Sequence, residues 1–183
     1  MLIPSQGPVP QQLGQPQPLR LAPLEDRFHD VGRQAGLVAT IDDIGDVVIS
    51  AAASGQMLRF NSSSWVNEDS PYDVGMFIPG THGNGALLAQ VVLTRAVRFA
   101  DDFAGARAYA GVSATADTVL DVHRNGSPIG TITFGTGAST GTFATGGSGA
   151  ETFAAGDRFA IINQDPADAT LADLSITFQG KRT

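Results

Sequence analysis

The histidines are the residues of this sequence best suited to acid–base or metal chemistry, and their spacing favours neither. The chain has three of them, His29, His82 and His123, and none has a second histidine at the spacing of a metal site. His82 lies in a glycine-rich segment, residues 79–85, that lacks the Lys-Ser/Thr ending and the strand-to-helix context of a phosphate-binding loop. We therefore expect His29 and His123 at the surface and His82 in a loop that joins two strands.

The acidic residues form adjacent pairs and one looser group. The pairs are Asp42-Asp43, Glu68-Asp69 and Asp101-Asp102. Neighbouring residues on a strand point to opposite faces, so we do not expect these pairs to converge as the two carboxylates of a glycosidase do. Asp165, Asp168 and Asp173 offer carboxylates to a calcium ion, but the residue order and the closing glutamate of a calcium loop are missing. We expect these three to be solvated loop acids.

Residues for nucleophilic catalysis are equally scarce. The chain has no cysteine, which excludes disulfides, thiol chemistry and cysteine-bound metal. Gly147-Ser148-Gly149 is a flexible turn, not the Gly-x-Ser-x-Gly elbow of a hydrolase between a strand and a helix. The sequence therefore predicts a protein that is not an enzyme, with no catalytic residue, no cofactor and no metal.

Three aromatic residues are the candidates for contact with a sugar. Trp65, Tyr72 and Tyr109 are the one tryptophan and the two tyrosines of the chain. Their rings have an apolar body and a polar group, which suits stacking on a sugar ring. A role in the core or in an interface is the alternative for each.

Composition narrows the range of partners. The 183 residues carry a formal charge of −7 with a pI near 4.7, which argues against nucleic acid and anionic membranes because both attract basic surfaces. No apolar run approaches the ~20 residues of a membrane span, so we expect no membrane insertion. The hydrophobic fraction of 42% is enough to fill a core. The length fits one domain of roughly 100–200 residues with an appendage.

The appendage is an N-terminal arm, residues 1–36. Its first 23 residues are dominated by proline and glutamine, which predicts an extended or polyproline-like chain. A short amphipathic helix over 24–36 is a further expectation, weakened by Gly32. Scattered aliphatic residues suit docking onto another subunit, and a disordered tail is the alternative interpretation. These candidate anchor residues are Leu2, Ile3, Leu13, Leu19, Leu21 and Leu24.

A small β-meander is predicted in residues 37–72. Strands over 47–50 and 56–60 and at Trp65-Val66 are separated by turns at Ser54-Gly55 and 61–64. A sheet of so few strands is not stable alone, and we therefore expect it to pack on copies of itself or on the main domain.

Residues 73–183 predict an antiparallel β-sandwich of the jelly-roll kind, because short strands alternate with turns and no helical window separates them. The expected strands are 75–79, 88–99, 106–110, 118–124, 129–134, 140–144, 151–153, 158–163 and 174–178. Asn125-Gly126 is the strongest hairpin signal. A plain two-residue loop would place Leu120 and Val122 on one face of the sheet and Ile132 and Phe134 on the other face. We prefer a three-residue loop or a bulge at Gly130, which puts all four on one face.

Two parts of the sequence resemble proteins of tailed bacteriophages. The phrases over 41–50, 55–61 and 65–67 resemble a short module of phage structural proteins: an acidic phrase, then Gly-Gln, then Trp-Val-Asn. The departures are Ile41 and Ile44 where leucine is usual and Phe60 where tyrosine is common. Residues 73–182 resemble the β-sandwich domains of phage fibre and spike proteins, through phrases such as Arg124-Asn125-Gly126 and the segment 169–177. A phage-like gene transfer agent would use the same kind of part.

This resemblance implies a non-enzymatic fibre or spike subunit (head spike, capsid fibre or tail fibre) on the particle surface, assembled in the host cytoplasm. Such proteins are often homotrimers, with an N-terminal portion bound to other virion proteins and a distal β domain facing the host. On this interpretation residues 1–36 are the anchor, residues 37–72 a collar, and the sandwich contacts host-surface polysaccharide. The alternatives are a monomeric carbohydrate-binding sandwich tethered to another assembly and, as a third class, a polysaccharide depolymerase.

Overall fold

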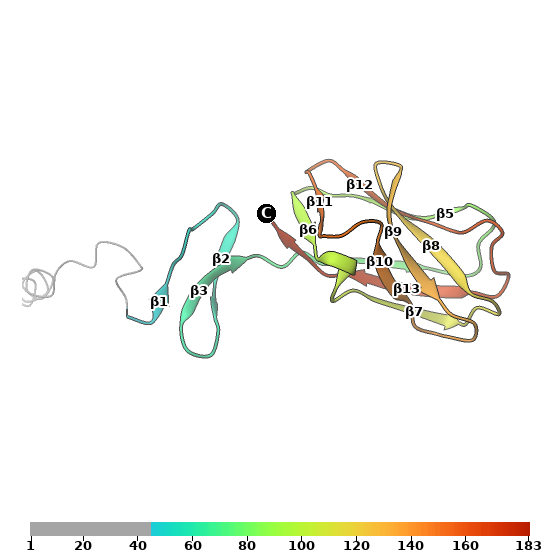
Figure 1. The fold of residues 1–183 in the computed structure, drawn as a ribbon, viewed down its shortest axis with the longest axis horizontal. Helices are drawn as coiled ribbons and strands as arrows, with labels where there is room; N and C mark the ends of the chain where they lie inside the picture. Colours follow the sequence, from blue (N-terminus) through green and yellow to red (C-terminus); the bar gives the residue numbers. More distant parts are fainter. Residues whose placement is uncertain (1–44) are drawn as a thin grey trace, which may run out of the picture. The chain divides into compact units, whose positions relative to one another are not determined.

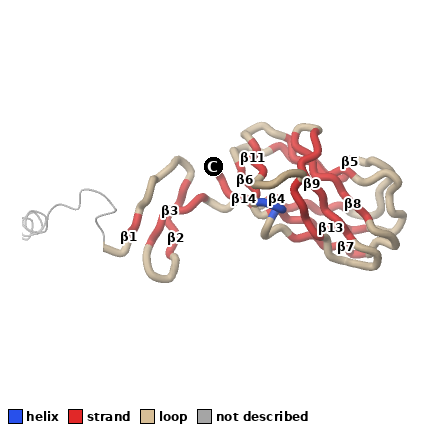
Figure 2. Tube along the Cα trace, in the orientation of Figure 1, coloured by secondary structure: helices blue, strands red, loops and turns tan. Residues whose placement is uncertain are grey.

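This computed structural model describes residues 45–183, and these residues are all-β (Figures 1 and 2). The strands form four sheets, and every pairing is antiparallel except that of β1 with β3. The all-β prediction is therefore confirmed. The candidate anchor residues and the helix expected over 24–36 lie outside the described residues.

A small three-stranded sheet is the first element of the described chain. It consists of β1 (Val47–Val48), β2 (Gln56–Phe60) and β3 (Trp65–Asp69). β2 and β3 form the predicted hairpin, with Phe60 opposite Trp65. The strand order is β1-β3-β2, with β1 parallel to β3, whereas a meander would have placed β2 in the middle. The expected sheet is present, and its topology corrects the prediction of a meander.

The sandwich consists of one five-stranded sheet and two three-stranded sheets that share a core. The five-stranded sheet has the order β10-β9-β8-β12-β5: Thr142–Thr145, Ser127–Phe134, Thr118–Arg124, Arg158–Ile162 and Leu87–Val92. The second sheet has the order β4-β13-β7: Val74–Ile78, Ala172–Phe178 and Arg107–Val112. The third has the order β11-β6-β14: Glu151–Phe153, Val97–Phe99 and Gly180–Arg182.

The hairpin at Asn125-Gly126 has both a two-residue loop and a bulge. Arg124 pairs with Ser127 across the loop, and the register shifts between Val122 and His123. The shift brings Leu120 opposite Ile132, and Leu120, Val122, Ile132 and Phe134 are all fully buried. The preferred register is confirmed, and a bulge, not a longer loop, produces it.

One predicted strand is divided and one strand was missed. The expected strand 88–99 is interrupted after Val92, because β5 pairs with β12 whereas β6 pairs with β11 and β14. The chain thus passes from one sheet to another at the buried Leu93. β14 follows β13 after the single residue Gln179, and its short Gly-Lys-Arg sequence carries no strand pattern.

Six phenylalanines pack together within the sandwich, and Phe178 at the end of β13 touches most of them. Its ring centroid lies 4.6 Å from that of Phe159, 5.2 Å from Phe103, 5.4 Å from Phe143 and 6.1 Å from Phe99. These contacts are near-perpendicular, an arrangement worth about 0.5–1.5 kcal/mol per pair beyond the buried area. Phe153 completes the cluster against Phe99 and Phe159.

Gly180→Ala tests how tightly the start of β14 packs against this cluster. A Cβ at Gly180 would lie 2.7 Å from the Tyr72 carbonyl oxygen, 2.8 Å from Val97 and 2.9 Å from Phe99. Overpacking of this kind costs about 1–3 kcal/mol, so chemical denaturation is expected to show a loss of that size in the free energy of unfolding. Gly147→Ala is the control, because nothing lies within 4 Å of its added Cβ. Equal stabilities of the two variants would contradict the packing described here.

Candidate functional site

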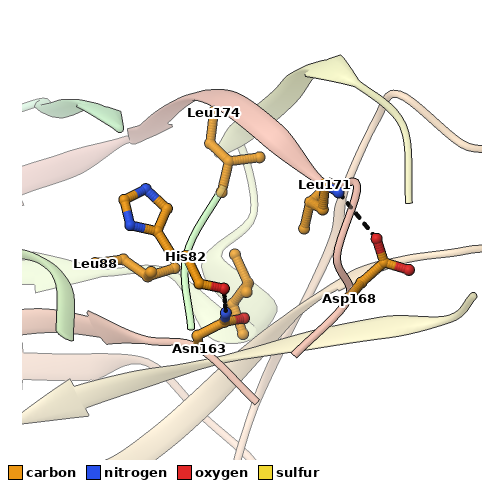
Figure 3. Close-up of a pocket in the computed structure, with 7 residues that line it drawn as sticks. His82, Leu88, Asn163, Asp168, Leu171 and Leu174 are labelled. Atoms are coloured by element: carbon orange, nitrogen blue, oxygen red, sulfur yellow. Dashed lines mark hydrogen bonds between the residues drawn. The ribbon is translucent and has the colours of Figure 1, made fainter. Parts of the chain in front are cut away.

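Asp168, which the sequence offered as a calcium ligand or a solvated acid, is a buried acceptor that joins two loops. Its Oδ1 accepts hydrogen bonds from Thr170 N (2.8 Å), Thr170 Oγ1 (2.6 Å) and Leu171 N (2.9 Å; Figure 3). Its Oδ2 accepts from Thr115 N (3.0 Å), Thr115 Oγ1 (2.9 Å) and Ala116 N (3.1 Å). The expectation of a solvated acid is wrong here, because both oxygens are fully engaged by the chain itself.

Neither neighbour of Asp168 joins it in a metal site. Asp165 is exposed, and Asp173 Oδ1 accepts a hydrogen bond from Gly80 N at 2.8 Å. Across residues 45–183 no three histidine or acidic side chains are grouped so that they could hold a metal ion. The Thr170 hydroxyl, followed by the backbone donors, holds the pKa of Asp168 well below its usual range.

Asp101 and Asp102 converge, contrary to the expectation for a strand. They lie in a single 3₁₀ turn, η2 (Asp101–Phe103), and Thr145 Oγ1 is 3.0 Å from Asp101 Oδ1 and 3.3 Å from Asp102 Oδ1. Gly149 N also donates to Asp101 Oδ1 at 2.9 Å, and this bond is the main cause of the lowered pKa of Asp101. The two carboxylates therefore hold the loop after β10 against η2.

Glu68 and Asp69 point to opposite faces of the small sheet, as expected. Glu68 forms an ion pair with Arg59 at 3.1 Å, and Asp69 accepts a hydrogen bond from Gln56 Nε2 at 3.1 Å. The pair Asp42-Asp43 lies outside the described residues.

His82 lies in the predicted loop, between β4 and β5, with its ring partly inside the protein (Figure 3). Its carbonyl oxygen accepts a hydrogen bond from Asn163 Nδ2 at 3.1 Å, whereas its Nε2 is buried without a hydrogen bond. The adjoining cavity measures about 10 Å³, about the volume that one water molecule needs. Such a cavity is too small for a substrate. His123 lies on β8 with Nδ1 3.1 Å from the Gly126 oxygen, and His29 is outside the described residues.

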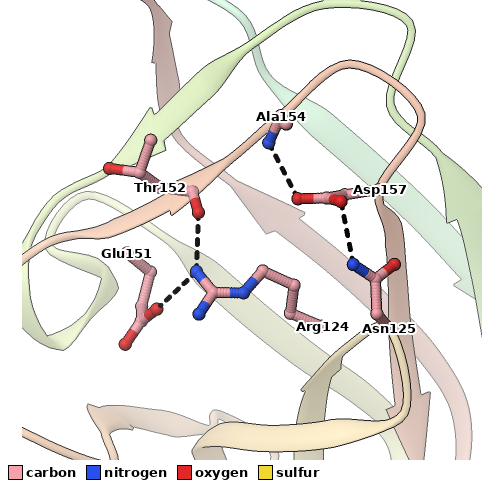
Figure 4. Close-up of polar contacts among 6 residues, drawn as sticks. All are labelled: Arg124, Asn125, Glu151, Thr152, Ala154 and Asp157. Carbon is pink, nitrogen blue, oxygen red and sulfur yellow. Dashed lines mark hydrogen bonds and ion pairs between the residues drawn. The ribbon is translucent and has the colours of Figure 1, made fainter.

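A polar network fixes the tip of the β8–β9 hairpin against the β11–β12 connection (Figure 4). One Arg124 nitrogen donates to Thr152 O at 2.6 Å and lies 3.3 Å from Glu151 Oε2. Asn125 Nδ2 donates to Asp157 Oδ1 at 2.8 Å, and Asp157 Oδ2 accepts from Ala154 N. The Asn125 bond is the main cause of the lowered pKa of Asp157. These side chains satisfy one another and leave no group poised for chemistry.

The three candidate glycan contacts lie on different elements. Trp65 begins β3 and is 44% exposed, Tyr72 lies between β3 and β4 and packs on the core, and Tyr109 is in β7 and is 55% exposed. Trp65 and Tyr109 each have an aromatic neighbour that the sequence did not indicate as a glycan contact. Phe60 stands 5.6 Å from Trp65, and Phe77 shares with Tyr109 the cross-strand partner Ser175. The alternation of side chains along a strand would have placed both phenylalanines beside these aromatic residues, but only if the pairing of the strands had been known.

The small sheet carries apolar side chains on both faces. Cross-strand pairing places Leu58, Phe60 and Trp65 on one face. Val48 and Met57 lie on the other, on the evidence of their partners Val66 and Glu68. All five are at least 37% exposed, which is unusual for large apolar residues grouped so closely.

Comparison of the chain with protein-family models, with curated proteins and with solved structures found no match. No helix in residues 45–183 has the length and apolar character to cross a membrane.

Asp168→Asn tests the role of the buried carboxylate. The amide nitrogen replaces an acceptor with a donor, which leaves buried donors unpaired, at a cost of about 1–3 kcal/mol in the free energy of unfolding. Because the folded-state pKa is depressed, the wild-type contribution is present above the unfolded pKa of about 3.9 and is lost as pH falls toward the folded value. Urea denaturation between pH 7 and pH 3 should show a smaller difference between the two proteins at acid pH.

The matched control is Asp121→Asn, because the Asp121 side chain makes no hydrogen bond or ion pair within residues 45–183. It should unfold like the wild type at both pH values. A calcium-dependent rise in stability that Asp168→Asn removes would contradict the structural role.

Proposed function

We propose that this chain is a non-enzymatic structural subunit of a phage-like particle, a fibre or spike on the capsid or tail. The N-terminal residues bind other virion proteins, and the sandwich faces the host and contacts its surface polysaccharide. This proposal joins the resemblance of residues 41–67 and 73–182 to phage structural proteins with the surface chemistry of the described residues.

The uncovered small sheet is the observation that carries the proposal. The sandwich fills its own core, with six large phenylalanine side chains fully or largely buried. In contrast, Val48, Met57, Leu58, Phe60 and Trp65 remain exposed on the small sheet. A sheet of three short strands gains little stability without a layer over its apolar face. Other copies of the chain in a particle-bound oligomer would supply that layer, and we favour a trimer on the resemblance.

A monomeric carbohydrate-binding sandwich is the second candidate function. Phe77 and Tyr109 favour it, because they are 66% and 55% exposed and stand on one face of the β4-β13-β7 sheet on either side of Ser175. Two strand spacings separate them by about 9.5 Å, an open aromatic platform of the kind that suits a sugar chain. On this account Tyr109→Ala removes glycan binding and the protein stays monomeric.

Deletion of the residues before Leu24 tests the anchor. Full-length and shortened proteins would be added to particles that lack this subunit, and bound protein would be quantified after sedimentation. The full chain is expected to decorate the particles and the shortened chain to remain in solution, because it lacks all the aliphatic residues that we assign to docking except Leu24.

The control for this experiment is Tyr109→Ala, which changes only the sandwich and should decorate particles like the wild type. The shortened chain should keep the denaturation midpoint of the full chain, so that a loss of attachment is not a loss of folding. Equal decoration by the shortened and full-length proteins would refute the anchor assignment.

A further inference from the structure

Two cations face each other on the outer side of the β11-β6-β14 sheet. Arg98 of β6 and Lys181 of β14 are direct cross-strand partners, and the residues on either side of Arg98 are buried, so the Arg98 side chain points outward. Side chains so paired have Cβ atoms about 4.5–5.5 Å apart, and like charges in this position are destabilising.

Neither cation is neutralised by another side chain of residues 45–183. Within residues 45–183 the ion pairs are Arg59 with Glu68 and Arg124 with Glu151, and no hydrogen bond involves the side chain of Arg98 or Lys181. The chain carries a formal charge of −7, so acids are abundant, yet no acid of residues 45–183 is within ion-pair distance of either residue. A destabilising pair left without a counter-ion favours an external anion between the two side chains.

The two cations line a hollow that has further features of a ligand site. It measures about 280 Å³, and the methyl groups of Ala100 and Ala104 contribute an apolar part of its wall. Gln179 and Asp69 line it as well. An adjacent hollow of about 430 Å³ is also lined by Asp69, Gln179 and Lys181, so the site has room for more than one sugar unit.

We propose that this hollow binds an acidic saccharide, with a ligand carboxylate between Arg98 and Lys181. The carboxylate accepts charge-assisted hydrogen bonds from both cations. Asp69 and Gln179 accept hydrogen bonds from sugar hydroxyls, and the two alanines contact the apolar face of the ring. Asp69 would repel a simple inorganic anion, whereas a sugar acid offers it hydroxyl donors, and this contrast selects the class of ligand. The inference deepens the polysaccharide contact of the proposed function and rests on that function for the source of the ligand.

Calorimetric titration of the full chain at low salt tests the site. The probes are a hexamer of galacturonic acid, neutral cellohexaose and sodium sulfate. The acidic hexamer is expected to bind, with an affinity that falls as sodium chloride is added, and cellohexaose is expected to give no heat. Arg98→Gln and Lys181→Gln should each weaken binding by about tenfold or more, the loss that corresponds to one charge-assisted hydrogen bond.

Arg158→Gln is the matched control, since it removes the same charge from an exposed position in β12 on another sheet, and it should bind within about twofold of the wild type. Removal of one member of a like-charge pair does not lower stability, so unchanged or higher denaturation midpoints for the two site variants would show that they are folded.

Three results would overturn the proposal. The first is no binding of the acidic hexamer at millimolar concentration, and the second is binding by the Arg98 and Lys181 variants as tight as that of the wild type. The third is that sulfate occupies the site as well as the acidic hexamer does at the same anion concentration. The last would indicate a simple anion site. Because the titration uses no particles, its failure leaves the decoration experiment untouched, and a failed decoration experiment leaves the saccharide site intact.

Discussion

Each apolar face of a β-sheet has to be covered by another layer, and this constraint orders the whole of the described chain. The sandwich meets it internally: the five-stranded sheet and the two shorter sheets cover one another, and Phe178 contacts side chains from several of their strands. Within residues 45–183 the small sheet meets it on neither face, as the exposed Phe60 and Trp65 on one face and the exposed Val48 and Met57 on the other show. This difference supports the proposed function, because a particle subunit has copies of itself and other proteins available to supply the missing layer.

The sequence predicted those elements that a few neighbouring residues determine, such as an alternating strand or a tight turn. Leu174, Ile176 and Phe178 alternate with polar residues, and all three are buried in a central strand. Asn125-Gly126 has positive φ angles at both residues, which is what a tight hairpin loop requires. The break after Val92 was not predictable in this way, because an apolar run is compatible with one long strand until the partners of each half are known.

The acidic residues show why the candidate site was harder to predict than the fold. Asp168 looked like an ordinary loop acid because its six donors come from residues more than fifty positions away or just after it. Asp101 and Asp102 converge only because a 3₁₀ turn replaces the assumed strand. Arg98 and Lys181 were equally hard to predict as a pair, because only the pairing of β6 with β14 brings them together.

The central claim is that other copies of the chain cover the small sheet. The most direct test is the absolute mass of the full chain in solution, determined by light scattering after size exclusion over a range of concentrations. The account predicts a stable oligomer, with a mass three times the 18.9 kDa of one chain. A monomer at every concentration would contradict it and would favour a tethered carbohydrate-binding module.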